Sequence, residues 1–278
     1  MTKVNTILKS SILLLAILAI AFMFTACGNK NNKSQFTEVK VDTNATYVDS
    51  TLGEVQQIIA DSTPETPSES ETFIYGYHLS MSMIVKTASQ DEITSNYNIF
   101  YKKTTDETGT KIEIALKVTN DFNNITSTFY YIINEPTDSE STADFYANIS
   151  NIGKFKMDMN TILGQSSIMT CEITTDLIEA LQPKTDNELM IDDNQFAIAN
   201  EETTTKIRII IPGATEEDNA TIYYILKDGN FNSMKVENLI QDNGPIGSNT
   251  ISLALTNWAG NIDYPNFKDY KTYVESIE

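Results

Sequence analysis

The sequence predicts an α+β protein built on a single curved antiparallel β-sheet of about eleven strands, with a few helices covering its concave face. Three observations support this fold class. Apolar and polar residues alternate in run after run from residue 73 onward. Turn signals such as "NIGK" and "KDGN" separate the runs. A segment without this alternation divides the runs into two blocks, and we expect it to supply helices for the apolar face of the sheet.

Residues 1–26 predict a lipoprotein signal peptide. A basic start with Lys3 and Lys9 precedes an apolar run from Ile12 to Ala26, which is nearer to the core of a signal peptide than to a membrane-spanning helix of about 20 residues. Residues 24–27, "FTAC", resemble a bacterial lipobox, which implies cleavage before Cys27 and a diacylglycerol on its sulfur. The alternative is an uncleaved anchor with an incidental cysteine. Either reading places the protein at the cell membrane, on its extracytoplasmic side.

Charge and cysteine content narrow the choice of partners. The chain carries a net charge of −19, and removal of residues 1–26 would take away two lysines and no acidic residue, leaving −21. Such a chain repels nucleic acid and anionic lipid, so we exclude nucleic-acid binding and expect the acyl chains to hold the protein at the membrane. Cys171 is the only other cysteine. It reads as a small buried apolar residue, and no disulfide is expected.

The segments before the sheet follow in order. Residues 27–48, beginning at the lipidated Cys27, are polar and read as a flexible stalk before a domain at 49–278. Asp49 or Ser50 is a plausible cap for a helix with one apolar face, formed by Leu52, Val55, Ile58 and Ile59. Residues 63–71 are rich in Pro, Ser and Glu and read as a loop. Alternatively, everything up to residue 71 is stalk.

The first block of strands is a predicted meander of about six, each half-buried. Its opening stretch is "TFIYGYHLSMSMIVK", Thr72 to Lys86, in which every second side chain is apolar. This strand exceeds the usual length of 3–10 residues and favours a sheet that curves around a cavity or a helix. The remaining apolar runs of the block are 97–101, 112–118, 125–133, 145–149 and 155–159.

The second block contains about five strands. Residues 161–183 interrupt the alternation and read as irregular or helical, with Thr175 or Asp176 as a cap and Pro183 as the end. Alternation returns in a weak pair within 188–200 and in the runs 207–211, 222–226, 234–236 and 251–255. Asp228-Gly229 predicts a tight hairpin turn between two of these runs.

At this level the chain resembles the LolA-like lipoprotein family, which includes LolA, LolB and the LppX/LprG-type lipoproteins. The likeness covers residues 50–268 and rests on the hairpin "YYILKDGNFNSMKVEN" and on the closing stretch "TISLALTNWAGNIDYPNFKDY", Thr250 to Tyr270, with Pro265. It implies a half-barrel sheet with helices on its concave face and an acyl-chain ligand beneath it. Because soluble LolA has no lipid anchor, Cys27 points to an anchored relative; the 63–71 loop and the strong negative charge depart from the family's pattern.

The candidate ligand-binding residues lie on the apolar face of the first strand. They are Tyr77, Leu79, Met81 and Met83, of which the methionines suit an adaptable lining. The alternative is that all four are ordinary core residues packed by the inserted helix.

The sequence carries little sign of catalysis. His78 is the only histidine and lies on the polar face with Ser80 and Ser82, but no nucleophile elbow or orienting acid is visible, so it reads as a solvent-facing residue. A histidine-built metal site is excluded, and the acidic stretches 191–194 and 215–219 read as charged loops. We therefore predict no catalytic residue, metal or cofactor, and no enzyme. The outward rings of the tyrosine pairs at 130–131 and 223–224 could contact a glycan or a protein.

Three functions follow as hypotheses. The first is an anchored lipoprotein that binds or carries an acyl chain or another hydrophobic ligand without covalent chemistry. The second has the same architecture with a packed core and acts as a surface interaction or adhesion module through tyrosines and acidic loops. The third and weakest is a hydrolase that uses His78.

Overall fold

The computed structural model describes residues 35–62, 73–87, 92–121, 125–150, 153–157, 191–242 and 247–272. The predicted signal peptide, Cys27, the loop at 63–71, the insert at 161–183 and Cys171 lie outside these residues. Within the described part of the chain, no helix has the length and apolar character needed to span a membrane.

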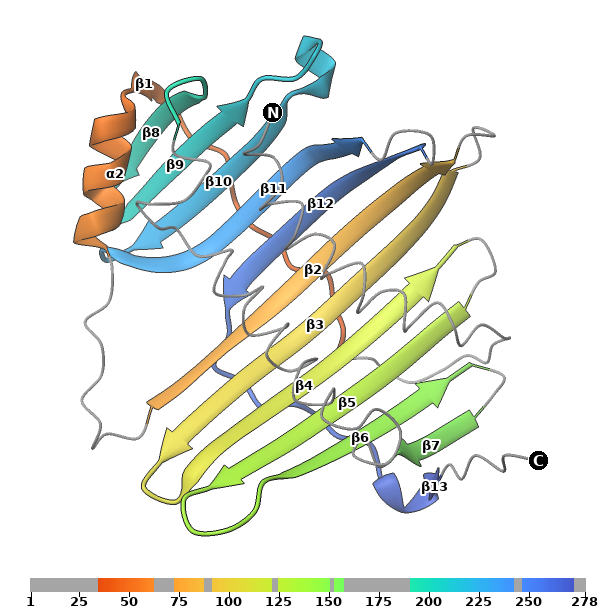
Figure 1. Ribbon diagram of the computed structural model, residues 1–278. Helices are drawn as coiled ribbons and strands as arrows, with labels where there is room; N and C mark the ends of the chain where they lie inside the picture. The colour runs from red at the N-terminus through yellow and green to blue at the C-terminus, as the bar shows by residue number, and fades with distance from the viewer. Residues whose placement is uncertain are drawn as a thin grey trace.

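In these described ranges, thirteen strands form one open sheet (Figure 1). Their order across the sheet is β1-β8-β9-β10-β11-β12-β2-β3-β4-β5-β6-β7-β13, so the two short strands β1 and β13 form its edges. The strands are β1 (Val48–Ser50), β2 (Phe73–Thr87), β3 (Glu92–Asp106), β4 (Gly109–Asn120), β5 (Ile125–Pro136), β6 (Thr142–Ile149), β7 (Gly153–Met157), β8 (Gln195–Glu201), β9 (Thr204–Ile211), β10 (Ala220–Lys227), β11 (Asn230–Asp242), β12 (Gly247–Asn257) and β13 (Lys271–Thr272).

The predicted fold class is wrong in three respects. The sheet has thirteen strands instead of about eleven, because β1 and β13 contain three and two residues and are too short to show an alternation. It is mixed instead of antiparallel, because β13 pairs with β7 in parallel. It is an open sheet instead of a half-barrel under several helices, and in the part of the chain that the structure describes α2 (Leu52–Asp61) is the only α-helix.

One pairing joins the two blocks of strands. β12 lies antiparallel to β2 over eleven residue pairs, from Gly247 opposite Thr87 to Asn257 opposite Tyr77. The predicted long strand is therefore an inner strand of the sheet, paired with β12 on one side and with β3 on the other. We call the β12–β2 pairing the seam. Consecutive strands from β2 to β7 and from β8 to β12 are joined by short connections, whereas the seam pairs segments far apart in the sequence, as do the edge pairings of β1 with β8 and of β13 with β7.

The apolar face of the sheet carries the main core and α2. Thr51 caps this helix, one residue after the predicted Ser50 and two after the predicted Asp49. Its hydroxyl accepts from the backbone N–H of Glu54, whose side chain accepts from the N–H of Thr51. Val55 and Ile59 of α2 are buried in one core cluster with β-strand residues of alternating position, among them Ile207, Ile209, Tyr224 and Leu255. We call this the helix face.

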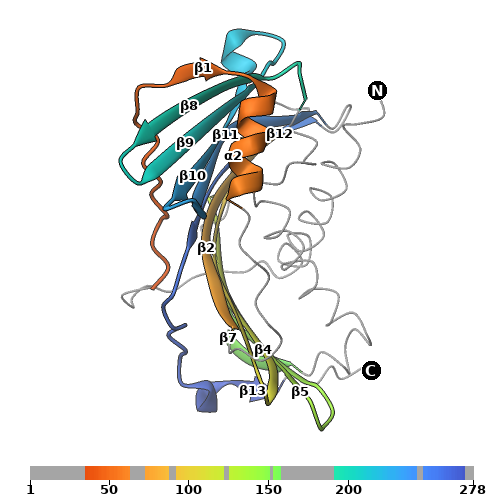
Figure 2. The same cartoon turned by 90° about the vertical axis from the view of Figure 1, so that its left-hand side faces the viewer.

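The opposite face is covered by two mostly irregular segments, which we name the strap (residues 35–47) and the tail (residues 258–270); the tail includes the short 3-10 helix η3 (Phe267–Asp269). Figure 2 shows α2 on one side of the sheet and both segments on the other. Trp258 of the tail donates its backbone N–H to Gly76, and the ring of Phe267 stacks on Tyr146 at 3.7 Å. Tyr264 donates its hydroxyl to Glu113. We call this side of the sheet the strap face.

The strap corresponds to the larger part of the predicted stalk. Residues 27–34 of that stalk lie outside the described residues, whereas residues 35–48 lie on the sheet. Val39 is 7% exposed, and Gln35 exchanges two hydrogen bonds with the backbone of Asp263 in the tail. This segment is held by side-chain hydrogen bonds and single aromatic contacts, so it shows neither a strand-like nor a helix-like period.

Candidate functional site

The four predicted ligand-binding residues all lie on the helix face, and all are buried. Tyr77 and Leu79 belong to the core cluster that α2 completes. Met81 and Met83 belong to a separate cluster with Tyr97 and Ile251. Their relative exposures are 8%, 1%, 3% and 1% in chain order. The strand therefore brings the four together on one face as predicted from its alternation, within two apolar clusters.

A groove of about 520 Å³ lies on the other side of the same strand, on the strap face. Its floor crosses five neighbouring strands, β11, β12, β2, β3 and β4, and strap residues 36, 38 and 39 form one wall. Most lining residues carry hydroxyl, amide or charged groups: Ser80, Ser82, Asn96, Asn98, Lys117, Thr119, Lys235, Glu237 and Ser252. Apolar residues complete the lining, and the predicted ligand-binding residue Met81 is among them: Phe36, Val39, Met81, Tyr97, Val236, Leu253 and Ala254. The described part of the chain therefore offers an open groove with a mixed lining, in which polar residues are the more numerous.

The strap is bound to the floor beside the groove by one serine and one asparagine. Ser80 on β2 and Asn98 on β3 lie directly opposite each other. The Asn98 amide donates to the carbonyl of Thr37 and to the Ser80 hydroxyl, and that hydroxyl also accepts from the backbone N–H of Val39 at 2.9 Å. Two side chains thus satisfy a backbone carbonyl and a backbone N–H of a segment that crosses the strands.

His78 joins this network through Asn98. Among the described residues, we observe no hydrogen bond between His78 and a serine. Its Nε2 lies 3.0 Å from the Asn98 Oδ1, and its ring stacks on Phe100 with centroids 4.0 Å apart. Burial lowers the pKa of His78, although the hydrogen bond to Asn98 acts in the opposite direction. The imidazole is therefore neutral at pH 7 and orients Asn98. His78 is 8% exposed, so the prediction of a solvent-facing residue is wrong.

A second serine–asparagine pair lies one step further along the same two strands. Ser82 faces Asn96 across the β2–β3 ladder, and the row continues to Ser252 on β12 and Thr119 on β4. Asn96 is exposed and Ser82 is half-buried. Within the described residues, neither side chain has a hydrogen-bond partner. The groove therefore contains an open copy of the pair that holds the strap.

The charges around the groove balance each other. Lys235 pairs with its neighbour Glu237 on β11. Lys117 on β4 and Glu38 on the strap are the other charged residues of the lining, and no carboxylate in the described part of the chain lies within ion-pair distance of Lys117. Two cations and two anions leave the lining neutral, in a chain whose net charge is −19. The groove thus lacks the strong negative charge of the chain as a whole.

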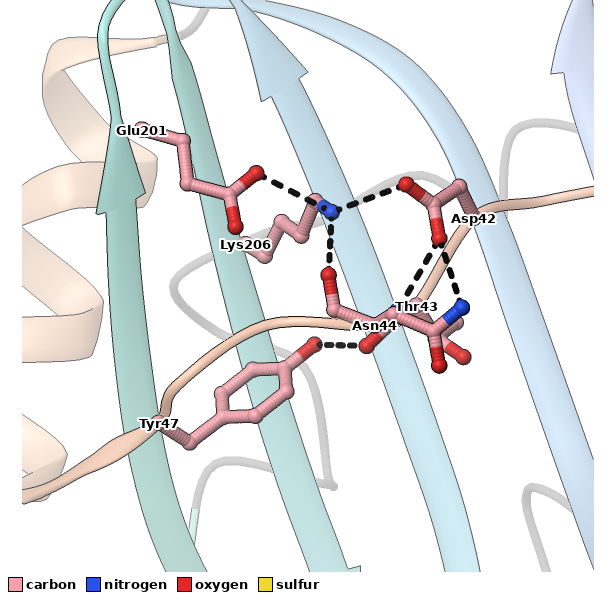
Figure 3. Close-up of polar contacts among 6 residues, drawn as sticks. All are labelled: Asp42, Thr43, Asn44, Tyr47, Glu201 and Lys206. Carbon is pink, nitrogen blue, oxygen red and sulfur yellow. Dashed lines mark hydrogen bonds and ion pairs between the residues drawn. The ribbon is translucent and has the colours of Figure 1, made fainter.

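The far end of the strap is fastened by a buried lysine (Figure 3). Lys206 on β9 has a side chain that is only 5% exposed, and its ammonium contacts Asp42 at 3.2 Å, Glu201 at 3.1 Å and the carbonyl of Asn44 at 2.7 Å. Desolvation opposes the charge on Lys206, but the hydrogen bonds to Glu201 and Asp42 outweigh it and raise its pKa. The lysine is therefore charged at neutral pH.

An aromatic contact follows the lysine. The guanidinium of Arg208 lies 4.6 Å from the centroid of the Tyr47 ring, which also packs on Tyr223. Burial raises the pKa of Tyr47 to about 12. Tyr47 donates its hydroxyl to the Thr43 carbonyl, which folds the strap back on itself before β1 begins (Figure 3).

The other predicted surface features are distributed as follows. Residues 216–218 form the short 3-10 helix η1 (Glu216–Asp218) with no buried residue, and residues 191–193 are exposed. Among the described residues, no group of three potential metal ligands comes together. The outward ring of Tyr130 is buried against the tail residues Tyr264 and Phe267, so it is not an exposed contact site.

Sequence reasoning missed the groove because it treated the alternate polar positions of the strands as a uniform solvated surface. The signal that could have revealed it is the repetition of serine at 80 and 82 opposite asparagine at 98 and 96. This repetition can be recognised only when the register between β2 and β3 is known.

Comparisons with known proteins leave the family open. No family model matches the chain, and no curated protein matches it. Among solved structures, the crystal structure of a candidate AttH protein from Nitrosomonas europaea aligns with 73% of this chain and 60% of its own length, at 12% identity and a TM-score of 0.19. A likeness at that TM-score carries no argument about fold or function. The resemblance to LolA-like lipoproteins therefore stays a prediction.

Proposed function

We propose that the protein is a lipid-anchored, extracytoplasmic lipoprotein that binds a polar partner through the groove on its strap face, without covalent chemistry. The observation that carries the binding role is the location of the open space. Polar residues are the more numerous in the groove lining and its charges balance, whereas Tyr77, Leu79, Met81 and Met83 are buried members of apolar clusters. Open hydrogen-bonding groups beside a neutral lining suit a polar ligand of low net charge.

A second candidate function is the binding of an acyl chain or another hydrophobic ligand on the helix face. It is favoured by the cluster of Met81, Met83, Tyr97 and Ile251, which is separate from the cluster that α2 completes. Methionines are flexible and can repack around a ligand. Such a ligand would have to enter a cluster whose members are all at most 5% exposed.

The anchor is tested by metabolic labelling of cells with an alkyne analogue of palmitate. We expect label on the wild-type chain and on a Cys171→Ala variant, and none on Cys27→Ala, which should also leave the membrane fraction or accumulate unprocessed. Equal label on the Cys27→Ala variant would contradict the lipobox assignment, because the chain has no third cysteine.

The two binding candidates are separated by extraction of the purified full-length chain with organic solvent, followed by mass spectrometry of the extract. The groove proposal predicts no stoichiometric non-covalent lipid. A lipid recovered at one equivalent, and lost when Met83 is replaced by a bulkier Phe, would favour the hydrophobic-ligand function instead.

A further inference from the structure

We propose that the groove is a binding site for an extended peptide that lies beside the strap and crosses the strands as the strap does. This inference rests on the proposed function, which it deepens by naming the class of partner. It starts from the fact that the strap is itself a polypeptide segment bound to this surface, so that its contacts show what kind of ligand the surface accommodates.

The first step is the chemistry of the bound segment. Ser80 and Asn98 hold one backbone carbonyl and one backbone N–H of the strap, at Thr37 and Val39. These two hydrogen bonds address the main chain, and beside them the ring of the strap residue Phe36 packs on Phe100. A pair of one hydroxyl and one carboxamide supplies both donors and acceptors, which is what a peptide backbone requires.

The second step is the spacing. Thr37 contacts β3 and Val39 contacts β2, so at this crossing the strap advances two residues between neighbouring strands. Neighbouring strands lie about 4.8 Å apart and an extended chain rises about 6.6 Å over two residues, so a chain that runs obliquely across the strands matches this step. A second chain at the same angle would bring alternate residues over Asn96 and Ser82.

The third step is that the second pair is open. Ser82 and Asn96 repeat the serine–asparagine pair two residues further along each strand, and their side chains have no hydrogen-bond partner within the described residues. They lie in the groove, whose wall is formed by strap residues Phe36, Glu38 and Val39. The neutral charge of the lining favours a peptide with little net charge, since neither a strongly acidic nor a strongly basic one finds an unbalanced partner there.

The experiment uses the full-length protein in detergent micelles and a displayed library of random eight-residue peptides. We expect neutral peptides to be enriched, and their affinity to fall at least tenfold in the Ser82→Ala/Asn96→Ala variant, because two backbone hydrogen bonds are removed. The matched control is Asn148→Ala, an exposed asparagine on β6 on the same face but outside the groove, which should change affinity less than twofold. Fluorescence of Trp258, the only tryptophan, reports whether each variant keeps its fold.

Three results would overturn the proposal. The first is that no peptide is enriched, and the second is that the enriched peptides bind the double variant as well as the wild type. The third is that neutral oligosaccharides on an array, and not peptides, bind the wild type and lose this binding in the double variant. None of these results bears on fatty-acid labelling at Cys27, so failure of the peptide site and failure of the anchored-lipoprotein proposal can be told apart.

Discussion

Gly76 on β2 is a position where a single methyl group decides whether the tail can lie on the sheet. A Cβ there would lie 2.6 Å from the carbonyl oxygen of Trp258 and 3.0 Å from that of Tyr101. Both are backbone atoms, and the Gly76 carbonyl itself accepts from the N–H of Trp258. The glycine is therefore required for close approach of two chain segments.

We expect Gly76→Ala to lower the free energy of unfolding by about 1–3 kcal/mol and to shift the fluorescence of Trp258 toward that of an exposed indole. The control is Gly53→Ala on α2, where a Cβ meets nothing within 4 Å and should raise stability by up to about 1 kcal/mol. Urea denaturation followed by fluorescence and circular dichroism measures both. An unchanged midpoint and spectrum in Gly76→Ala would show that the tail does not lie where we describe it.

His78 makes the free energy of unfolding depend on pH near and below pH 6.5, where few other side chains titrate, because it is the only histidine of the chain. Its pKa is lowered in the folded state from the ordinary value of 6.5, so the unfolded chain takes up a proton first as the pH falls. Stability contributed by the neutral imidazole is therefore complete above pH 6.5 and is lost as the pH falls below that value. The sign follows from the unfolded state binding more protons.

The free energy of unfolding should accordingly fall more between pH 7.5 and pH 5.5 for the wild type than for a His78→Gln variant. Urea titrations at three pH values in this range measure the two slopes. Parallel slopes would mean that His78 titrates alike in the folded and unfolded chain.

At the scale of the elements, the strap depends on Lys206. A Lys206→Met variant removes the ammonium and leaves Asp42 and Glu201, whose side chains are 72% and 47% exposed and can be hydrated. An Asp42→Asn/Glu201→Gln variant instead leaves a buried ammonium whose acceptors are all neutral amide and carbonyl oxygens, with no carboxylate to balance its charge. We expect the double variant to lose about 3 kcal/mol and Lys206→Met distinctly less, because an unpaired buried charge costs more than a missing pair.

The control for this comparison is Lys86→Met, which breaks an exposed ion pair with Glu92 and should cost less than about 1 kcal/mol. Trypsin gives a second measurement, since Lys40 on the strap is exposed and should be cleaved faster when the strap loosens. A double variant as stable as the wild type would mean that the strap is not fastened at this point.

Some of the elements could be predicted from the sequence and others could not. Strands with one buried face were predictable, and so was the hairpin at Asp228-Gly229, where both residues have positive φ, 51° and 76°. α2 was predicted with its cap one or two residues early. The strap was not predictable as a bound segment, because its partners Ser80 and Lys206 are distant in sequence and ordinary for a strand surface. The open pair Ser82 and Asn96 was missed for the same reason.

At the scale of the whole molecule, the seam makes the two blocks of strands depend on each other. Leu255 on β12 is fully buried and pairs with Leu79 on β2, so the main core extends across the seam. A sheet whose blocks share a core is expected to unfold in one step. Circular dichroism, which reports on all strands, and fluorescence of Trp258 should therefore give coincident urea transitions.

Leu255→Ala should move both transitions together, with a loss of about 2–5 kcal/mol. Its control is Val48→Ala on the edge strand β1, where the side chain is 68% exposed and the effect should lie within about 0.5 kcal/mol. Two separate transitions, or a shift of only one of them, would show that the seam does not couple the blocks.

The short segment before the strap limits how far from the membrane the groove can bind a ligand. Only eight peptide units separate Cys27 from Gln35, and Gln35 is tied to Asp263 on the strap face. Eight units span no more than about 30 Å. If Cys27 carries the proposed acyl chains, this tether keeps the strap face close to the bilayer. Any molecule that enters the groove must then itself reach the membrane-proximal layer of the envelope.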